Sequence, residues 1–292
     1  MSDTQVNPLL FLITTVIFYF KINEGKVIMN KDNAALESRI EAVLKKESGI
    51  FAVAVFNPLT GQELSINSRP MRSASLIKLF IMAEAFARIS EGTLNADATL
   101  AFTESHRVGG AGILQNLPAG THHSILTLVE LMITESDNIA TNLLIEHFGS
   151  EAINARIRKM GCADSRLCRQ MMDFDAAAEG RENMTSVRDT ARALQQIFLN
   201  QCVDITADCA MREILGRQTD RCKIPLHLPP DTICQHKTGE LPGAEHDAGI
   251  VYSPFGPYIV AIMSDNLPDP EQGRQVVAKL SREIYDFFID VE

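Results

Sequence analysis

The sequence predicts an α/β chain of the α+β type, with an antiparallel sheet flanked by N- and C-terminal helices and an inserted all-helical domain. Strand-like runs of apolar residues gather at residues 51–66 and 232–263, near the two ends of the chain. The residues between these runs carry almost only helical periodicity. We therefore expect residues 31–68 and 220–292 to build one α/β domain and residues 69–219 to form the helical domain.

The first part of the chain is predicted to be a helix followed by a hairpin. Residues 34–46 place their apolar side chains on one helical stripe, and Gly49 ends the pattern. Residues 51–56 and 63–66 have the composition of strands, and the Asn-Pro-Leu-Thr-Gly sequence between them is typical of a turn. The two strands are therefore expected to pair.

The middle of the chain is predicted to be helical. An apolar run begins at Ser75 and stops near Gly92, and a helix that is apolar on nearly all sides is a buried one. Ser73 is its expected N-cap. The glycine-rich residues 107–114 lack the strand–glycine–helix pattern of a phosphate-binding loop and predict a plain loop. Further helical patterns cover residues 126–133, 139–148, 151–160, 186–199 and 207–215.

Strands return at the end of the chain. A proline-rich linker, with Pro225, Pro229 and Pro230, precedes them. A final helix follows Asp269-Pro270 and carries an apolar stripe. The strand-like runs of this part are residues 232–238, 248–252 and 258–263.

Length and charge limit the possible partners. The 292 residues suffice for one or two domains with a buried core. The net charge is −10 and no run of basic residues occurs, which disfavours nucleic acid and anionic membrane surfaces as partners. We expect a monomer.

Residues 1–30 form an apolar extension with three open interpretations. Its core, residues 9–20, is shorter than the roughly 20 residues that cross a bilayer, but it has the length of a signal-peptide core. Asp3 precedes this core and the first basic residue, Lys21, follows it, which is the wrong order for a signal peptide. The segment is a signal or anchor, an extension upstream of a start at Met29, or packed structure. A signal or anchor predicts a periplasmic, secreted or anchored protein. The other two interpretations predict a cytoplasmic protein.

Cysteine and histidine give no metal-site pattern. The six cysteines permit disulfides, but free thiols fit a chain of this length equally well, and no Cys-x-x-Cys spacing occurs. His122 and His123 have no companion motif for zinc. We expect no metal or other cofactor.

Ser75 and Lys78 form the first chemical motif. Both lie at the start of the predicted buried helix, three residues apart and so on one face. A serine hydroxyl becomes a nucleophile when a neighbour takes its proton, and a desolvated amine can do so. An ordinary helix start would look the same, so this motif alone is weak.

Two further polar motifs interrupt apolar elements. Ser136-Asp137-Asn138 separates two helical patterns and would also serve as a cap, while the same tripeptide at residues 264–266 is predicted to be a turn. Lys237-Thr238-Gly239 ends a strand-like run. It would offer an ammonium and a hydroxyl to a substrate carboxylate, and its glycine would let a ligand lie close to the backbone.

The order of the three motifs is more specific than any one of them. Ser-x-x-Lys, then Ser-Asp-Asn, then Lys-Thr-Gly is the signature of class A β-lactamases and penicillin-binding proteins. Over residues 33–290 the chain resembles the class A serine β-lactamase family. The resemblance implies the fold predicted above and a serine hydrolase.

The resemblance also implies a role for each motif. Ser75 would be the acylated nucleophile, Lys78 would accept its proton, and Ser136 would pass a proton to the leaving nitrogen. The backbone N–H groups of Ser75 and Glu240 would form the oxyanion hole. Asn138 would hold the side-chain amide of the substrate and also Lys78. Lys237 and Thr238, together with the adjoining Gly239, would bind the substrate carboxylate.

The chain departs from the family in one loop. Hydrolytic members carry Arg-x-Glu-x-x-x-Asn, whose glutamate activates the deacylating water, whereas residues 169–175 place Met171 at the glutamate and Asp175 at the asparagine. A thioether cannot take a proton from water. The family's additional carboxylate-binding arginine is not identifiable near Lys237. The acids that might substitute as the base are Asp173, Asp175, Glu179 and Glu182.

Three classes of function remain open from the sequence. The chain is a serine β-lactamase whose deacylation is slow, an enzyme acting on D-Ala-D-Ala peptides or small esters, or a binder that stays acylated, as a sensor would. All three take a small-molecule substrate, a β-lactam or a D-Ala-D-Ala-like peptide. The loop that contains Met171 favours slow turnover, and it therefore favours the second and third of these classes.

Overall fold

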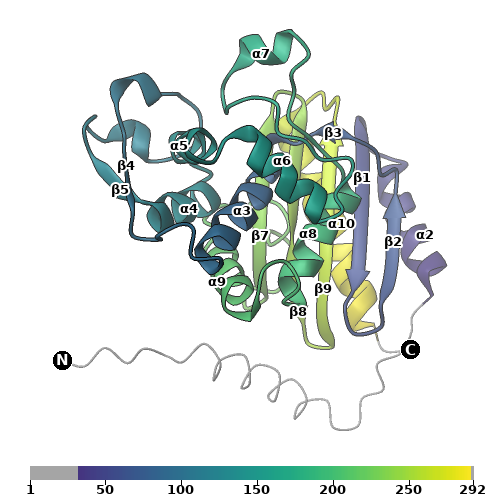
Figure 1. Cartoon of the computed structure of the whole chain (residues 1–292). Helices are drawn as coiled ribbons and strands as arrows, with labels where there is room; N and C mark the ends of the chain where they lie inside the picture. The colour runs from purple at the N-terminus through teal and green to yellow at the C-terminus, as the bar shows by residue number, and fades with distance from the viewer. Residues whose placement is uncertain (1–31, 291–292) are drawn as a thin grey trace.

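A five-stranded antiparallel sheet organises the molecule (Figure 1). The structure is a computed structural model that describes residues 32–290. The strand order is β2-β1-β9-β8-β7, and every pairing is antiparallel. The strands are β1 (Ile50–Asn57), β2 (Gln62–Ile66), β7 (Ile233–Leu241), β8 (Ala244–Ser253) and β9 (Gly256–Asp265).

Both ends of the described chain contribute to this sheet. The hairpin of β1 and β2 is present as predicted, and β1 also pairs with the last strand, so that Val53 lies opposite Ile262. Because residues far apart in sequence share one sheet, the predicted α+β arrangement is confirmed.

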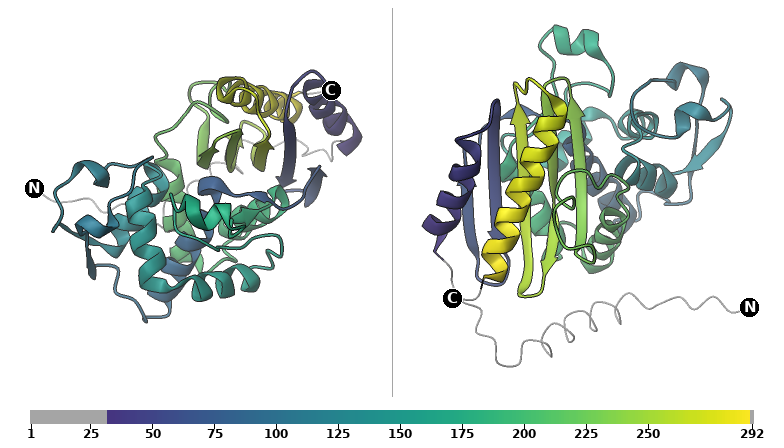
Figure 2. Two further views of the ribbon diagram at one scale, coloured as in Figure 1. Left: turned by 90° about the horizontal axis from the view of Figure 1, so that it is seen from above. Right: turned by 180° about the vertical axis from the view of Figure 1, so that it is seen from behind.

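Helices cover both faces of the sheet. Figure 2 shows α2 (Asn33–Leu44) and α10 (Pro270–Ile289) side by side across one face. On the other face α8 (Val187–Phe198) packs against β1 and β9, and α9 (Ile205–Gly216) packs against β7. The remaining longer helices are α3 (Lys78–Ser90), α4 (Ile125–Thr134), α5 (Asn138–Phe148) and α6 (Ser150–Lys159).

Strand β1 shows why the sheet needs helices on both sides. Alternate side chains of a strand point to opposite faces. Phe51, Val53 and Val55 join the core under α2 and α10, whereas Ala52 and Ala54 join the core shared with α3, α4 and α8. The apolar run of β1 is therefore continuous because both of its faces are buried.

Several short elements were not predicted from the sequence. They are β3 (Met71–Arg72), β6 (Met184–Thr185), β4 (Thr99–Ala101), β5 (His122–Ser124), the 3₁₀ turns at Ala74–Ile77, Glu104–His106 and Leu114–Asn116, and α7 (Phe174–Ala178). Elements of two to five residues are too short to show a period of 3.6 or 2. One of them, the pair of β3 and β6, ties the segment before Ser75 to the segment after the loop of Met171.

The expected N-cap at Ser73 is wrong. Helix α3 begins at Lys78, and the preceding residues form the 3₁₀ turn Ala74–Ile77. Ser73 itself has helical dihedral angles and makes no cap hydrogen bond. Its hydroxyl donates to the carbonyl of Ala74, whose φ of 46° turns the chain into the left-handed region before Ser75.

Two further expectations from the sequence concern the N-terminal apolar segment and the cysteines. The apolar residues 9–20 lie outside the described residues. Among residues 32–290 no helix is both long and apolar enough to cross a membrane. All six cysteines lie within the described part of the chain, and all six are free thiols.

Candidate active site

The 3₁₀ turn between β3 and α3 holds Ser75 at the wall of a cleft of about 670 Å³. Ser136, Asn138, Thr238, Gly239 and Glu240 line the same cleft. These residues come from the α4–α5 junction and from β7, so the fold brings the three sequence motifs to one place. Lys78 and Lys237 lie fully buried behind them.

Lys78 is held by the α4–α5 junction. Its Nζ atom donates hydrogen bonds to the Ser136 carbonyl at 2.7 Å, to Ser136 Oγ at 3.1 Å and to Asn138 Oδ1 at 3.0 Å. Burial, and secondly the charge of Lys237, lower the pKa of Lys78 well below its ordinary value. This shift favours the neutral amine, which is the form of lysine that can accept a proton.

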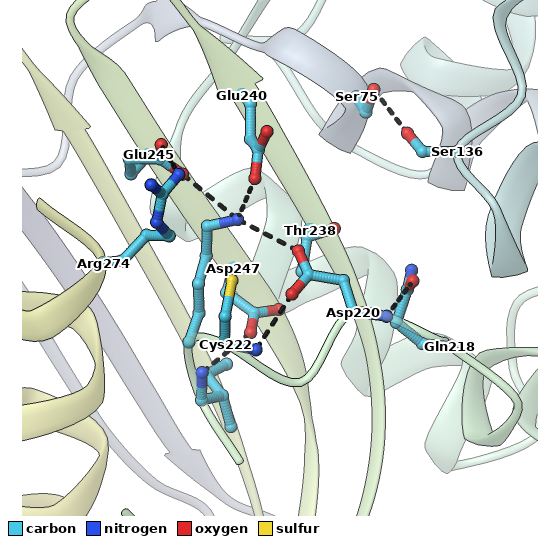
Figure 3. Close-up of polar contacts among 12 residues, drawn as sticks. Ser75, Ser136, Gln218, Asp220, Cys222, Thr238, Glu240, Glu245, Asp247 and Arg274 are labelled. Carbon is cyan, nitrogen blue, oxygen red and sulfur yellow. Dashed lines mark hydrogen bonds and ion pairs between the residues drawn. The ribbon is translucent and has the colours of Figure 1, made fainter. Parts of the chain in front are cut away.

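Ser136 connects the two lysines to Ser75. Its hydroxyl accepts hydrogen bonds from Lys78 Nζ and Lys237 Nζ, each at 3.1 Å, and donates to Ser75 Oγ at 2.9 Å. Ser136 has a φ of 52°, an uncommon value for a non-glycine residue, and Asp137 directly after it caps α5 through the backbone N–H of Ala140. Figure 3 shows the hydroxyls of Ser75 and Ser136 facing each other.

Strand β7 supplies Lys237 and the residues that follow it. Lys237 Nζ also donates to the Thr238 carbonyl at 2.7 Å. Burial, and secondly the charge of Lys223, lower the pKa of Lys237 to about 7. Packing favours glycine at position 239, because a Cβ atom there would lie 3.1 Å from Ala74 Cβ and 3.2 Å from the Ser75 nitrogen, both tighter than ordinary contact. Glycine therefore allows β7 to approach the turn that carries Ser75.

Met171 lines the cleft from the loop that precedes α7. The side-chain amide of Asn142 holds its backbone at both ends, accepting from Met171 N at 2.7 Å and donating to Met171 O at 3.1 Å. Only 8% of Met171 is exposed. The residue that borders the cleft at this point thus has no group that can act as a base.

The four acids considered as substitutes differ in their positions. Among the described residues, Glu182 is the only one of the four that lines the cleft, and Arg169 binds it through Nε at 2.9 Å and Nη2 at 2.8 Å. Asp173 caps α7, Glu179 pairs with Arg181, and Asp175 is exposed. The one loop acid of these four that borders the cleft is therefore already paired.

Sequence reasoning missed Lys223 and Arg274. Lys223 is fully buried, and its Nζ lies 2.7 Å from Glu240, 3.1 Å from Glu245 and 3.2 Å from Asp220. Burial alone lowers the pKa of Lys223, but the charges of the three carboxylates outweigh it and raise the pKa above its ordinary value. Folding brings these residues together from a loop and two strands, so no local pattern signals them.

Arg274, at the start of α10, lines the cleft next to this group and donates to Glu245 Oε1 at 3.0 Å (Figure 3). The ligand atoms of Asp220, Cys222 and Glu240 also lie within 4.8 Å of one another. The ammonium of Lys223 already supplies a positive charge to Asp220 and Glu240, so this cluster does not need a metal ion.

Comparisons with known proteins point to one enzyme family. A family model described as the β-lactamase enzyme family matches residues 35–288. A β-lactamase of Bacteroides uniformis is 24% identical, over 89% of this chain and 93% of that protein. The crystal structure of a β-lactamase from Sphaerobacter thermophilus has a TM-score of 0.82 and 28% identity, over 88% of this chain and 98% of that one. A mutant of PBP-A, solved as an acyl-enzyme complex with penicillin-G, has a TM-score of 0.81 and 25% identity, over 90% and 99%.

Proposed function

The chain belongs to the β-lactamase enzyme family, and we propose that it opens β-lactam amides through an acyl-enzyme on Ser75 that is hydrolysed slowly. The observation that carries this proposal is the hydrogen-bonded arrangement of Ser75, Ser136, Lys78 and Lys237 in the wall of one cleft. A hydrolase of this family needs a serine with a proton acceptor and a proton donor beside it, and these contacts provide both.

Acylation follows from the contacts of the two serines. Ser75 Oγ attacks the lactam carbonyl carbon while its proton passes to Ser136 Oγ and the proton of Ser136 passes to the neutral amine of Lys78. The two hydrogen bonds of Ser136 to Ser75 and Lys78 therefore run in the reverse direction during this step. When the C–N bond breaks, the lactam nitrogen takes the proton of the Ser136 hydroxyl, and Lys78 returns its proton to Ser136. The product of this step is an ester on Ser75. The proton that Ser75 lost is balanced by the one that the lactam nitrogen gained, and Ser136 and Lys78 are back in their starting protonation states.

The carbonyl oxygen gains negative charge during the attack. The backbone N–H groups of Ser75 and Glu240 are the proposed donors to it, because donors fixed in advance stabilise charge that appears in the transition state. The position of Gly239 supports this assignment, since a glycine is what lets the strand of Glu240 lie directly against the nitrogen of Ser75. The substrate carboxylate would be bound by Lys237 and Thr238.

Deacylation is the step that lacks an evident base at the point where the family's hydrolytic members carry one. Met171 borders the cleft where the family's hydrolytic members place a glutamate, and Glu182 is engaged by Arg169. Loss of a general base typically lowers a rate by about 10²- to 10⁴-fold. The acyl-enzyme should therefore form faster than it is hydrolysed. A mutant of PBP-A, which has the same fold, has been solved as an acyl-enzyme complex with penicillin-G.

A direct test compares a chromogenic β-lactam with a plain chromogenic ester under stopped-flow conditions. We expect a stoichiometric burst on the lactam followed by slow multiple turnovers, and little reaction with the ester. A burst without any later turnover would contradict hydrolysis and indicate a protein that stays acylated. Faster turnover of the ester than of the lactam would contradict the proposed substrate class.

A further inference from the structure

The side chain of Glu240 carries a negative charge into the cleft next to the proposed carboxylate site. It follows Lys237-Thr238-Gly239 directly on β7. Side chains two residues apart on a strand point to the same face and lie about 7 Å apart. The carboxylate of Glu240 is thus a same-face neighbour of the Thr238 hydroxyl, and Figure 3 shows both residues on this strand.

Glu240 is the most exposed member of the group around Lys223. The Glu240 side chain is 54% exposed, whereas those of Glu245 and Lys223 are 3% and 0% exposed. The Glu240 carboxylate accepts from Lys223 Nζ at 2.7 Å, the shortest of the three contacts of this ammonium. One buried cation therefore serves three carboxylates that all line the cleft, and Glu240 is the most exposed of them, ahead of Asp220 at 27%.

The other cations in the cleft wall do not offset this charge. Among the described residues that line the cleft, Arg169 pairs with Glu182, and Arg274 pairs with Glu245 and Glu271. An incoming carboxylate next to Thr238 would meet the ammonium of Lys237 on one side and the carboxylate of Glu240 on the other. Lys223, the nearest further cation, is already bound by Glu240.

We propose that Glu240 is a specificity-determining residue whose side chain occupies Lys223 and weakens the recognition of the substrate carboxylate, so that the protein accepts substrates with an uncharged group at that position unusually well. This inference rests on the proposed acylation of Ser75. It concerns only the side chain of Glu240, since the backbone N–H proposed for the oxyanion hole is unchanged by substitution.

The test uses benzylpenicillin and its methyl ester, which differ only in the charge of the carboxyl group. The second-order rate constant of acylation is measured for both by the appearance of the adduct mass, and the acid-to-ester ratio is compared between proteins. Two charges at about 7 Å in a partly solvated cleft interact strongly enough to change a rate constant by about tenfold. We expect the ratio to rise about tenfold in Glu240→Gln, and further in Glu240→Ala, which cannot hold Lys223 with an amide oxygen.

The control is Glu37→Gln, which removes one negative charge from an exposed position on α2, on the opposite side of the sheet from α8. Its ratio should equal that of the wild type. An unchanged or lower ratio in both Glu240 variants, while Ser75 is still acylated, overturns the inference and leaves the proposed function standing. Absence of any adduct with either compound contradicts the proposed function and this inference together.

Discussion

Replacing Met171 by glutamate should restore a base at the point where the cleft lacks one. The backbone of Met171 is held at both ends by Asn142, at 2.7 and 3.1 Å, so the new carboxylate would start from a fixed position. Met171 already lines the cleft, as Ser75 does. Met171→Glu should therefore shorten the lifetime of the acyl-enzyme without changing the rate at which it forms.

The size of the effect follows from the chemistry and the burial of the site. General-base catalysis is typically worth about 10²- to 10⁴-fold, or roughly 3–5 kcal/mol. Only 8% of Met171 is exposed, and burial raises the pKa of a carboxyl group, which leaves part of the glutamate protonated at pH 7. We therefore expect the acyl-enzyme to be hydrolysed about 100-fold faster, near the lower end of this range. Burial of the polar carboxyl group should also lower the free energy of unfolding by about 1–3 kcal/mol.

The assay is the decay of the penicillin adduct mass after excess β-lactam has been removed. Met171→Gln is the matched control, because glutamine is polar and has nearly the size of glutamate but cannot take a proton from water. Faster decay in the glutamate variant alone supports a missing base. Equal decay in the two variants, or a wild-type adduct that already decays within seconds, would refute the reasoning and direct attention to Glu182.

Four other outcomes follow from the structure. Because the pKa of Lys237 is about 7, kcat/KM for a carboxylate-bearing lactam should fall as pH rises through this value and Lys237 loses its charge; the methyl ester should lack this limb, and identical profiles would contradict the assignment. Lys237→Ala should cost the charged lactam roughly 1.5–3 kcal/mol of transition-state binding and the ester little, which the kcat/KM ratio measures. Glu182→Gln should change the adduct lifetime by less than about threefold, since Arg169 already binds Glu182; a larger increase would identify it as the base. Asn142→Ala should lower the free energy of unfolding by about 2–4 kcal/mol, seen as a lower Tm, because two buried backbone groups of Met171 lose their partner.

The longer elements of the fold were predictable because their side-chain periods are long enough to count. The apolar run of residues 51–56 belongs to β1, which extends one residue further at each end, and the stripe of the last helix belongs to α10, which begins at Pro270. The two-residue strands β3 and β6 have no period. Ser73 shows a different limit, since a capping residue type was present but the chain turned into a 3₁₀ helix instead.

The sequence order of the motifs indicated which residues meet at the site, but not what surrounds them. The spacing from Ser75 to Lys237 says nothing about Lys223, which reaches Glu240 only because a loop folds behind β7. Likewise, four loop acids were equivalent in the sequence, whereas their positions differ in the structure, where Glu182 borders the cleft. Contacts between side chains from separate elements depend on tertiary packing, which a single sequence does not reveal.

The central claim is that Ser75 carries a long-lived acyl group. It is tested most directly by mixing the full chain with benzylpenicillin, measuring its intact mass at seconds and at hours, and mapping the adduct by proteolysis. The account predicts one penicillin per chain within seconds, on the peptide that contains Ser75, still present after hours and absent from Ser75→Ala. An adduct that Ser75→Ala retains, or no adduct in the wild type at any time, would contradict it.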